Sequence, residues 1–317
     1  MYDIIGDIHG YADELIELLD RLGYRETHGV FRHSNRKAVF CGDFIDRGPQ
    51  IRDVLSVVRS MCEHDAALAV MGNHELNALA FHTPDPANID EFLRRHNAQN
   101  LHQHQATLDQ LSTSELQAAL AWFRTLPASF DGGDFRVVHA CWDAVNLATL
   151  ALANEQLGTM SVEFLQRATA KGDPVFEAIE RVLKGPEMKL PGGVEVTDKE
   201  GNRRTRARIR WFESPDDYQC GNYCLPPQPL PALANITVPD HARPAVYPAK
   251  APPVFFGHYW LPPTNPSPLR TNIACLDYSV AKDGFLCGYR FNGESILRSE
   301  HFHRVQSRTR LSHTSSR

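Results

Sequence analysis

The sequence has no long apolar run, no surplus of positive charge and no pair of cysteines at the spacing of a common zinc motif. It contains 317 residues, with 33 Lys and Arg against 38 Asp and Glu, which gives a formal net charge of −5. Without about eighteen consecutive apolar residues, a membrane-spanning helix is excluded. A net negative charge provides no general attraction to nucleic acid or to an anionic membrane. Neither is therefore expected as a partner.

The cysteines are few for this length and odd in number. The seven are scattered through apolar runs, and a chain this long does not need disulfides for stability. Cys220 and Cys224 have three residues between them rather than the usual two, and no second pair follows, so a structural zinc is not expected. Residues 2–5 already have the pattern of a core strand, which leaves no room for a leader. We expect reduced thiols and a soluble, cytoplasmic protein.

Apolar strand patterns alternate with helical patterns over the first eighty residues. Strand-like runs at 2–5, 38–41 and 67–71 each end at a polar, glycine-flanked segment, and apolar stripes with helical spacing cover 15–22 and 51–58. Further strand-like runs lie at 135–139, 254–257, 273–276 and 285–291. This alternation predicts an α/β fold with parallel strands and helical crossovers.

Two insertions interrupt this pattern. Residues 81–134 predict a small helical cap, and residues 145–253 form a second insertion that ends in a proline-rich loop. Fourteen of the 21 prolines lie between Pro215 and Pro268, too many for regular structure, so this segment is expected to be an extended loop. It is either a lid or a surface strap, and its position before His258 favours the lid. We expect one domain over 1–305, with core segments 1–80, 135–144 and 254–300, and a disordered tail over 306–317.

Residues of the kinds that bind metals recur in three glycine-flanked signatures. These are Gly6-Asp7-Ile8-His9-Gly10, Gly42-Asp43-Phe44-Ile45-Asp46-Arg47-Gly48 and Gly72-Asn73-His74-Glu75, and His139 and His258 follow in shorter motifs. Each lies where a strand is expected to end, and ligands gather at the carboxyl ends of parallel strands. Oxygen and imidazole ligands without thiolates suit divalent ions, with manganese expected and iron, cobalt or zinc as alternatives. There are enough ligands for two ions.

The spacing suggests how two ions share these ligands. Asp7 and His9 are two residues apart at a strand end, so both side chains project to the same side and can bind one ion. Asp43 has two carboxylate oxygens and can bridge to a second ion. Asn73, His139 and His258 supply the second ion with an amide oxygen and two imidazoles. Two such cations supply a hydroxide nucleophile near neutral pH, and the planar guanidinium of Arg47 suits two phosphate oxygens.

These motifs resemble those of the calcineurin-like metallophosphoesterases. The resembled branch contains the serine/threonine phosphoprotein phosphatases and the bacterial symmetrical bis(5′-nucleosyl)-tetraphosphatases, and the resemblance is continuous over 1–80 and fragmentary over 135–143 and 254–291. It implies a layered sandwich of mixed sheets flanked by helices, and it implies the same six metal ligands. It also implies that His74 protonates the leaving oxygen while Asp46 orients His74. Glu75 is expected only to support the site.

The chain departs from the family pattern beside two of the ligands. Cys141-Trp142-Asp143 follows the motif of His139 where glycine is usual, and Tyr259-Trp260 follows His258. The two aromatic residues either stack a nucleobase or close the core, and we favour the core. Cys141 is expected to be a small hydrophobe rather than a reactive thiol. The remaining histidines are expected at the surface, among them His28, His33, His64, His82, His96, His102 and His104.

One pattern is independent of the family. Arg204, Arg206, Arg208 and Arg210 alternate with other residues, which predicts a strand with four cations on one face. If this strand lines the cleft, Arg206 and Arg208 bind the distal phosphates of a polyphosphate or a phosphorylated macromolecule. The alternative is a solvated edge strand protected by its charge.

The motifs together predict a binuclear metal-dependent phosphohydrolase. The substrate is expected to be a phosphorylated small molecule or a dinucleoside polyphosphate. A serine/threonine protein phosphatase is the second hypothesis, because only the insertions would differ. A phosphate-binding protein without catalysis is the third, and the intact set of ligands argues against it.

Overall fold

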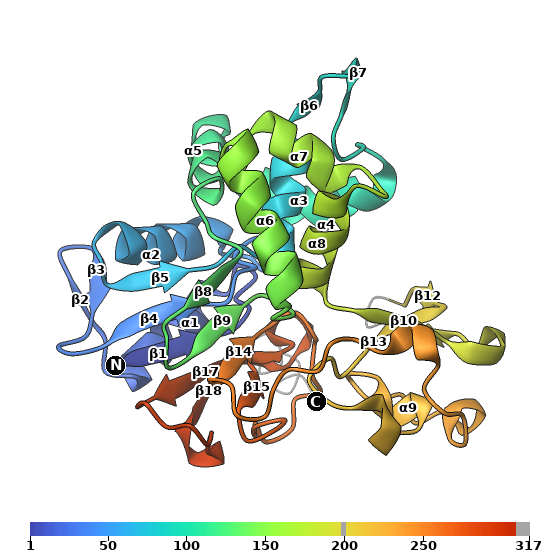
Figure 1. The fold of residues 1–317 in the computed structure, drawn as a ribbon. Helices are drawn as coiled ribbons and strands as arrows, with labels where there is room; N and C mark the ends of the chain where they lie inside the picture. The colour runs from blue at the N-terminus through green and yellow to red at the C-terminus, as the bar shows by residue number, and fades with distance from the viewer. Residues whose placement is uncertain (198–200, 309–317) are drawn as a thin grey trace, which may run out of the picture.

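Two β-sheets packed face to face form the centre of the molecule (Figure 1). The computed structural model describes residues 1–197 and 201–308. The first sheet has the order β16-β17-β1-β4-β5, with β18 beside β17. Strands β1, β4 and β5 run parallel, as expected from the alternation in sequence, whereas β17 is antiparallel to β1. The six strands are β1 (Tyr2–Ile5), β4 (Lys37–Phe40), β5 (Ala67–Ala69), β16 (Asp277–Tyr278), β17 (Phe285–Phe291) and β18 (Phe302–Gln306).

The second sheet has the order β15-β14-β9-β8. Its strands are β8 (Ser129–Asp131), β9 (Arg136–Val138), β14 (Val254–Phe256) and β15 (Ile273–Cys275). Aromatic rings join the two sheets, because the ring centroid of Phe255 lies 5.0 Å from that of Tyr289 and 5.8 Å from that of Phe291. Buried aromatic pairs contribute roughly 0.5–1.5 kcal/mol beyond their area. This interface holds the ends of β9 and β14 in place relative to those of β1 and β4.

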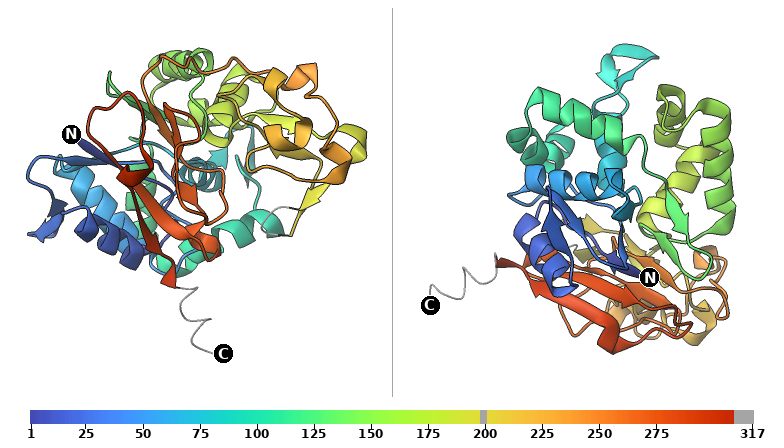
Figure 2. Two further views of the ribbon diagram at one scale, coloured as in Figure 1. Left: turned by 90° about the horizontal axis from the view of Figure 1, so that it is seen from below. Right: turned by 90° about the vertical axis from the view of Figure 1, so that its left-hand side faces the viewer.

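Helices flank the two sheets, which completes the predicted layered α/β sandwich (Figure 2). Helices α1 (Ala12–Arg21) and α2 (Ile51–Glu63) contact strands of the first sheet. The apolar stripe that predicted α1 is fully buried, with Leu15, Leu18 and Leu19 at 0% exposure. Helices α6 (Ala144–Leu157), α7 (Val162–Thr169) and α8 (Pro174–Lys184) pack on one another beside the second sheet. A small hairpin of β2 (Arg25–Thr27) and β3 (Val30–Arg32) lies between α1 and β4 along the chain.

The insertion at 81–134 is largely helical, as predicted. It follows α3 (Asn73–Phe81) and contains a hairpin of β6 (Pro84–Asp85) and β7 (Asn88–Phe92), then α4 (Ala98–Gln110) and α5 (Thr113–Phe123). The helices separate at Ser112, whose side chain caps α5 together with Glu115. Helix α4 begins earlier than the apolar spacing indicates, within the polar stretch, because Asn97 caps its first turn.

The second insertion contains a small core of its own. Its strands are β10 (Glu187–Lys189), β11 (Val196–Thr197), β12 (Arg203–Arg204) and β13 (Arg206–Arg208), and α9 (Cys220–Tyr223) follows. The proline-rich segment is not simply extended, since it forms short 3₁₀ turns that pack Leu233 and Val238 against Met188 and Ile209. Cys220 and Cys224 are buried free thiols in this cluster. The division into one domain with core segments and insertions stays a prediction.

The chain end departs from the predicted disordered tail at its first residues. Gln306 is the last residue of β18, and the backbone N–H of Arg308 donates to Glu14 at 2.7 Å. The Arg308 guanidinium also lies 2.8 Å from Asp13 on α1. The expectation of disorder is therefore wrong for 306–308, and residues 309–317 lie outside the described residues.

A buried cluster of three charged residues joins β1 to β17 and to the residue just before β4. Asp3, with 0% exposure in the middle of β1, accepts from the Nε atoms of Arg36 and Arg290 at 2.9 Å each. Removing one member of such a cluster leaves a buried charge without its partner. We expect Asp3→Ala to lower the free energy of unfolding by about 3–5 kcal/mol, measured by chemical denaturation.

The matched control for this prediction is Asp65→Ala. Asp65 pairs with Lys37 near the same sheet, but its side chain is 83% exposed. Exposed pairs contribute only about 0–1 kcal/mol. Equal destabilisation by the two substitutions would show that the buried pair has no special role.

Candidate metal centre

The predicted ligands converge at the carboxyl ends of β1, β4, β9 and β14. Asp7 and His9 follow β1, Asp43 follows β4, and Asn73 begins α3. His139 and His258 follow β9 and β14 of the second sheet. All six side chains are buried, with exposures between 0% and 7%. Residues separated by up to 251 positions in the sequence thus surround one small space.

The ligand atoms form two groups that share Asp43. One consists of His9, Asp43 and His74, the other of Asp43, His139 and His258, and within each group the atoms lie within 4.8 Å of one another. Asp43 Oδ2 lies 3.6 Å from His9 Nε2 and 3.4 Å from His139 Nε2. A carboxylate placed between two sets of imidazoles suits a bridging ligand of a two-ion site.

Two of the histidines are oriented by backbone carbonyls. The Nδ1 atom of His9 lies 3.0 Å from the Ile45 oxygen, and that of His139 lies 2.7 Å from the Cys41 oxygen. A carbonyl only accepts, so Nδ1 carries the proton in both rings and Nε2 is directed at the other ligands, with that of His139 3.1 Å from Asn73 Oδ1. This arrangement is typical of metal-binding histidines.

Several buried polar atoms at this centre lack a hydrogen-bond partner within the described chain. They are Asp7 Oδ1, His9 Nε2, and both ring nitrogens of His258. Leaving buried polar groups unsatisfied costs about 1–3 kcal/mol each, and bound cations would remove that penalty. Oxygen and nitrogen donors of this kind fit divalent ions of the manganese, iron, cobalt or zinc type. The residues therefore fit the metals that the motifs imply.

The local electrostatics also favour cations. Burial, and then the charge of Asp277, raise the pKa of Asp7 well above its usual value. Burial lowers the pKa of His9 to about 3, so this imidazole is neutral, as a metal ligand must be. Burial, and then the positive charge of Arg208, also lower the pKa of His258.

Close packing around the ligands requires glycine at two positions. A Cβ atom on Gly257 would lie 1.8 Å from Asp7 Oδ1, and one on Gly72 would lie 2.2 Å from Asp43 Oδ1. The signature loops also hold non-glycine residues in the left-handed region, with φ of 48° at His9, 54° at Asp43 and 68° at His258. Such conformations cost about 1–3 kcal/mol each and cluster at functional sites.

Asp46 and His74 form a hydrogen-bonded pair beside the ligands. Asp46 Oδ2 lies 2.6 Å from His74 Nδ1, and His74 Nε2 lies 4.0 Å from Asp43 Oδ2. Burial alone would lower the pKa of His74, but Asp43 and Asp46 outweigh it and raise the pKa. The same pairing, together with His104, holds the pKa of Asp46 well below its usual value. The imidazole of His74 is thus held through Nδ1, with Nε2 directed towards the centre.

Glu75 supports the loop that carries Asp43. Its carboxylate accepts from the backbone N–H groups of Asp43, Phe44 and Gly72 at 2.8–3.0 Å. Three such bonds hold the second and third signatures together. This geometry agrees with the supporting role expected for Glu75.

A cationic pocket of about 770 Å³ opens beside the centre. Asp43, Asn73, His74 and His258 line it together with Arg47, Arg206 and Arg208. Within the described chain, six arginines and one lysine line this pocket against the two carboxylates of Asp43 and Glu187. The cations are Arg47, Arg94, Lys184, Arg203, Arg204, Arg206 and Arg208. In a chain of net charge −5, this is a strong local concentration of positive charge.

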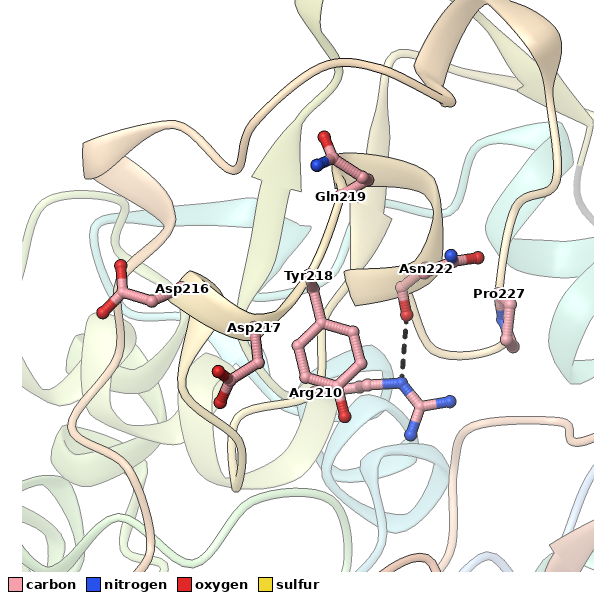
Figure 3. A pocket seen from close by; sticks show the side chains of 7 residues that line it. All are labelled: Arg210, Asp216, Asp217, Tyr218, Gln219, Asn222 and Pro227. Atoms are coloured by element: carbon pink, nitrogen blue, oxygen red, sulfur yellow. Dashed lines mark hydrogen bonds between the residues drawn. The ribbon is translucent and has the colours of Figure 1, made fainter.

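The predicted strand with four arginines on one face is only partly correct. Arg204 and Arg206 belong to separate strands, β12 and β13, and the strand pattern ends at Arg208. Arg210 points into a different pocket, where its Nε donates to the Asn222 carbonyl at 3.1 Å beside Tyr218 (Figure 3). The chain turns there because Trp211 is buried against Phe256.

The two aromatic residues after His258 differ in their surroundings. Tyr259 is fully buried, as expected for a core residue. Trp260 is half-buried and lines the pocket, where the guanidinium of Arg47 lies 4.6 Å from its ring centroid. The core interpretation is therefore wrong for Trp260. Cys141 is buried, and burial raises the pKa of its thiol, so it is not a reactive thiolate.

The sequence interpretation missed His104. It was expected at the surface, but it is only 4% exposed, and its Nδ1 lies 2.8 Å from Asp46 Oδ1. Thr107, one turn later on α4, donates to the same oxygen at 2.6 Å. The spacing of three residues between two polar side chains was the available signal, but nothing in the sequence showed which way that helical face points.

The comparison with known proteins agrees with this geometry. The model of the calcineurin-like phosphoesterase family matches residues 2–181, more than half of the chain. The protein therefore belongs to the calcineurin-like phosphoesterase family. In the part of the chain that the structure describes, no helix is both long and apolar enough to cross a membrane.

Individual relatives match over shorter stretches. The chain is 46% identical over 74 residues to the asymmetrical bis(5'-nucleosyl)-tetraphosphatase PrpE of Halalkalibacterium halodurans, covering 23% of this chain and 30% of that protein. It is 32% identical over 136 residues to the symmetrical bis(5'-nucleosyl)-tetraphosphatase of Aromatoleum aromaticum, covering 43% of this chain and 42% of that protein. The chain thus spans less than half the length of these curated relatives.

A solved structure shows the same fold over nearly the whole chain. The cold-active protein-tyrosine phosphatase of a psychrophilic Shewanella aligns with a TM-score of 0.51 at 17% identity. The alignment covers 96% of this chain and 80% of that one. At this identity the similarity concerns the fold alone.

Proposed function

We propose that the protein is a binuclear metal-dependent phosphoesterase that hydrolyses a phosphate ester or a phosphoanhydride. The main support is the pair of buried ligand groups that share Asp43 beside a cationic pocket. Membership of the calcineurin-like family supports the same chemistry. The proposed ligands are Asp7, His9, Asp43, Asn73, His139 and His258.

The chain's own residues have distinct parts in this reaction. Two bound cations would neutralise phosphate oxygens and lower the pKa of a water molecule towards neutrality. Arg47 binds two phosphate oxygens through its planar guanidinium, which the ring of Trp260 supports. His74 donates a proton from Nε2 to the leaving oxygen. Asp46 holds Nδ1 of the same ring and fixes its orientation.

The arginines of the second insertion suit a substrate with several phosphates. One phosphoryl group needs little more than the metal ions and Arg47, whereas the pocket has six further cations. We propose that Arg206 and Arg208 bind the distal phosphates. Arg206 pairs with Glu187 at 3.2 Å, and its side chain is 54% exposed, so a polyanion can displace that weak pair.

Replacing both arginines is expected to affect long substrates selectively. Charge-assisted hydrogen bonds contribute about 1.5–3 kcal/mol each, and about 1.4 kcal/mol corresponds to a tenfold change. The double substitution Arg206→Ala and Arg208→Ala should therefore raise the KM for diadenosine tetraphosphate at least about tenfold. The KM for p-nitrophenyl phosphate should change less than about twofold.

Arg210→Ala is the matched control, because Arg210 lies on the same segment but outside the pocket. Metal content is measured for each variant, because Arg208 contributes to the electrostatics around His258. If the double variant leaves the KM of both substrates equally unchanged, the arginines do not bind substrate.

A dinucleoside polyphosphate is the substrate class that we propose. It has the several consecutive phosphates that the pocket suits, and two relatives bear the name bis(5'-nucleosyl)-tetraphosphatase. A phosphoprotein is the alternative substrate. The pocket opposes it, because segments of both insertions line its walls and restrict access for a folded partner.

Product analysis tests this proposal. Metal-stripped protein with Mn²⁺ restored is incubated with diadenosine tetraphosphate, and a phosphothreonine peptide is assayed in parallel. Hydrolysis to two ADP, or to ATP and AMP, with an unreactive peptide supports the proposal and shows where the anhydride is cleaved. Dephosphorylation of the peptide alone would make the protein a serine/threonine phosphatase.

Manganese is the proposed metal, because the donors are oxygen and imidazole without thiolate. We also propose a cytoplasmic location. All seven cysteines are free thiols, which suits a reducing compartment.

A further inference from the structure

Helix α4 of the first insertion directs two polar side chains at Asp46. His104 and Thr107 are three residues apart and so share one face of the helix. His104 Nδ1 lies 2.8 Å from Asp46 Oδ1, and Thr107 Oγ1 donates to the same oxygen at 2.6 Å. Thr107 Oγ1 also accepts from the backbone N–H of Asp46 at 3.0 Å. Asp46 is thus held from the helix through both its backbone and its side chain.

These contacts determine which carboxylate oxygen of Asp46 is available to accept a hydrogen bond from His74. Oδ1 is occupied by His104 and Thr107, whereas Oδ2 lies 2.6 Å from His74 Nδ1. Asp46 itself has a left-handed backbone with φ of 63° and lies in a loop outside the helices and strands, where its carbonyl accepts from the Gly48 N–H at 3.2 Å. Its carboxylate therefore depends on side-chain contacts for its orientation.

We infer that His104 is a positioning residue, which acts through Asp46 to hold the imidazole of His74 against the leaving group. This inference rests on the proposed phosphoesterase function. It adds a residue outside the three signatures, contributed by a segment that looks like a simple cap in the sequence. His104 is not among the residues that line the pocket, and its ring nitrogens face Asp46 and His82.

A second histidine contacts the far side of the His104 ring. Its Nε2 lies 3.1 Å from Nε2 of His82, at the end of α3. Ionised Asp46 only accepts hydrogen bonds, so Nδ1 of His104 carries a proton, while Nε2 of the same ring faces His82. Burial, with the nearby charges of His104 and His96, lowers the pKa of His82 to about 4, so His82 stays neutral. The side chains of His82, His104, Asp46 and His74 thus form one continuous hydrogen-bonded series.

The test uses leaving groups that differ in their need for a proton. Phenyl phosphate has a basic leaving oxygen that requires protonation, whereas 2,4-dinitrophenyl phosphate leaves as a stable anion. We expect His104→Ala to lower kcat for phenyl phosphate about 10- to 100-fold. This fall is smaller than the full contribution of a general acid, because His74 is still present but is held less well. The kcat for the dinitrophenyl ester should fall less than about threefold.

Two amide substitutions distinguish the loss of the hydrogen bond between His104 and Asp46 from the loss of the packing of the His104 ring. The amide nitrogen of Asn is as many bonds from Cα as Nδ1 of histidine, so His104→Asn should restore most of the rate. The amide nitrogen of Gln matches Nε2, so His104→Gln should not. His102→Ala is the control on the same helix, because His102 is exposed. An equal fall for both esters, or no fall, would show that His104 does not position the acid.

A second measurement is independent of any substrate. In metal-free protein, NMR of the imidazole N–H groups should show two downfield protons, one from His104 and one from His74, both bonded to Asp46. His104→Ala should remove the His104 signal and shift the His74 signal. His104→Asn should return the His74 signal to its wild-type position. An unshifted His74 proton would overturn the inference. If wild-type protein hydrolyses neither the esters nor diadenosine tetraphosphate, the proposed function fails instead.

Discussion

Asp43→Ala is expected to abolish metal binding and hydrolysis together. Asp43 is the one residue common to both ligand groups, and its Oδ2 lies within 4 Å of His9, His74 and His139. Without it, the remaining imidazoles would place two cations close together with no bridging negative charge. We expect fewer than one ion per chain by elemental analysis, against two in wild-type protein, and a rate that falls to the uncatalysed background.

Folding must be intact for this result to be informative. Asp53→Ala is the matched control, because Asp53 is an exposed aspartate on α2 outside the site. It should retain two ions and full activity. An Asp43→Ala protein that keeps both ions and hydrolyses at the wild-type rate would show that Asp43 does not bridge a metal pair.

His74→Ala is expected to slow turnover while both metals stay bound. His74 Nδ1 is occupied by Asp46, and only Nε2 faces the centre. General acids contribute about 10²- to 10⁴-fold to the rate. We therefore expect kcat for phenyl phosphate to fall by about that factor with about two ions per chain retained, whereas the dinitrophenyl ester should lose much less.

The metal content of His74→Ala separates two roles for this residue. His74 Nε2 belongs to the same ligand group as His9 and Asp43, so its position also suits a ligand. Metal loss from His74→Ala equal to that from Asp43→Ala would make His74 a ligand and remove the assignment as general acid. The inference for His104 would then concern the orientation of a ligand.

The sequence allowed the core of the fold to be predicted because strand and helix periodicities are local. Residues 2–5, 38–41 and 67–71 have apolar patterns that depend only on their own neighbours, and they form β1, β4 and β5 within one or two residues. The buried stripe of α1 follows from the same kind of spacing. Parallel strands then bring the three signatures to one edge.

The direction in which side chains of the insertions point was harder to predict, because it depends on long-range packing. His104 lies on a polar helix whose composition resembles a solvated one, and only the packing of α4 turns it towards Asp46. Arg210 continues the alternation of Arg206 and Arg208, but burial of Trp211 turns the chain away from the pocket. In both cases a local pattern does not specify the surface that it faces.

The proline-rich segment was misjudged for a different reason. Prolines exclude helices and central strands, which suggested an extended loop. Apolar residues between them, such as Leu233 and Val238, nevertheless pack on β10 and β13 and form a second core. Leu225, Pro226 and Pro262 reach the wall of the pocket, which places part of this segment beside the site, as the lid hypothesis requires.

The most direct test of the binuclear site is anomalous scattering from crystals soaked with MnCl₂. Two manganese peaks should flank Asp43, one near His9 and one near His139 and His258. A single peak, or manganese bound only elsewhere on the protein, would contradict a two-metal centre and with it the proposed mechanism.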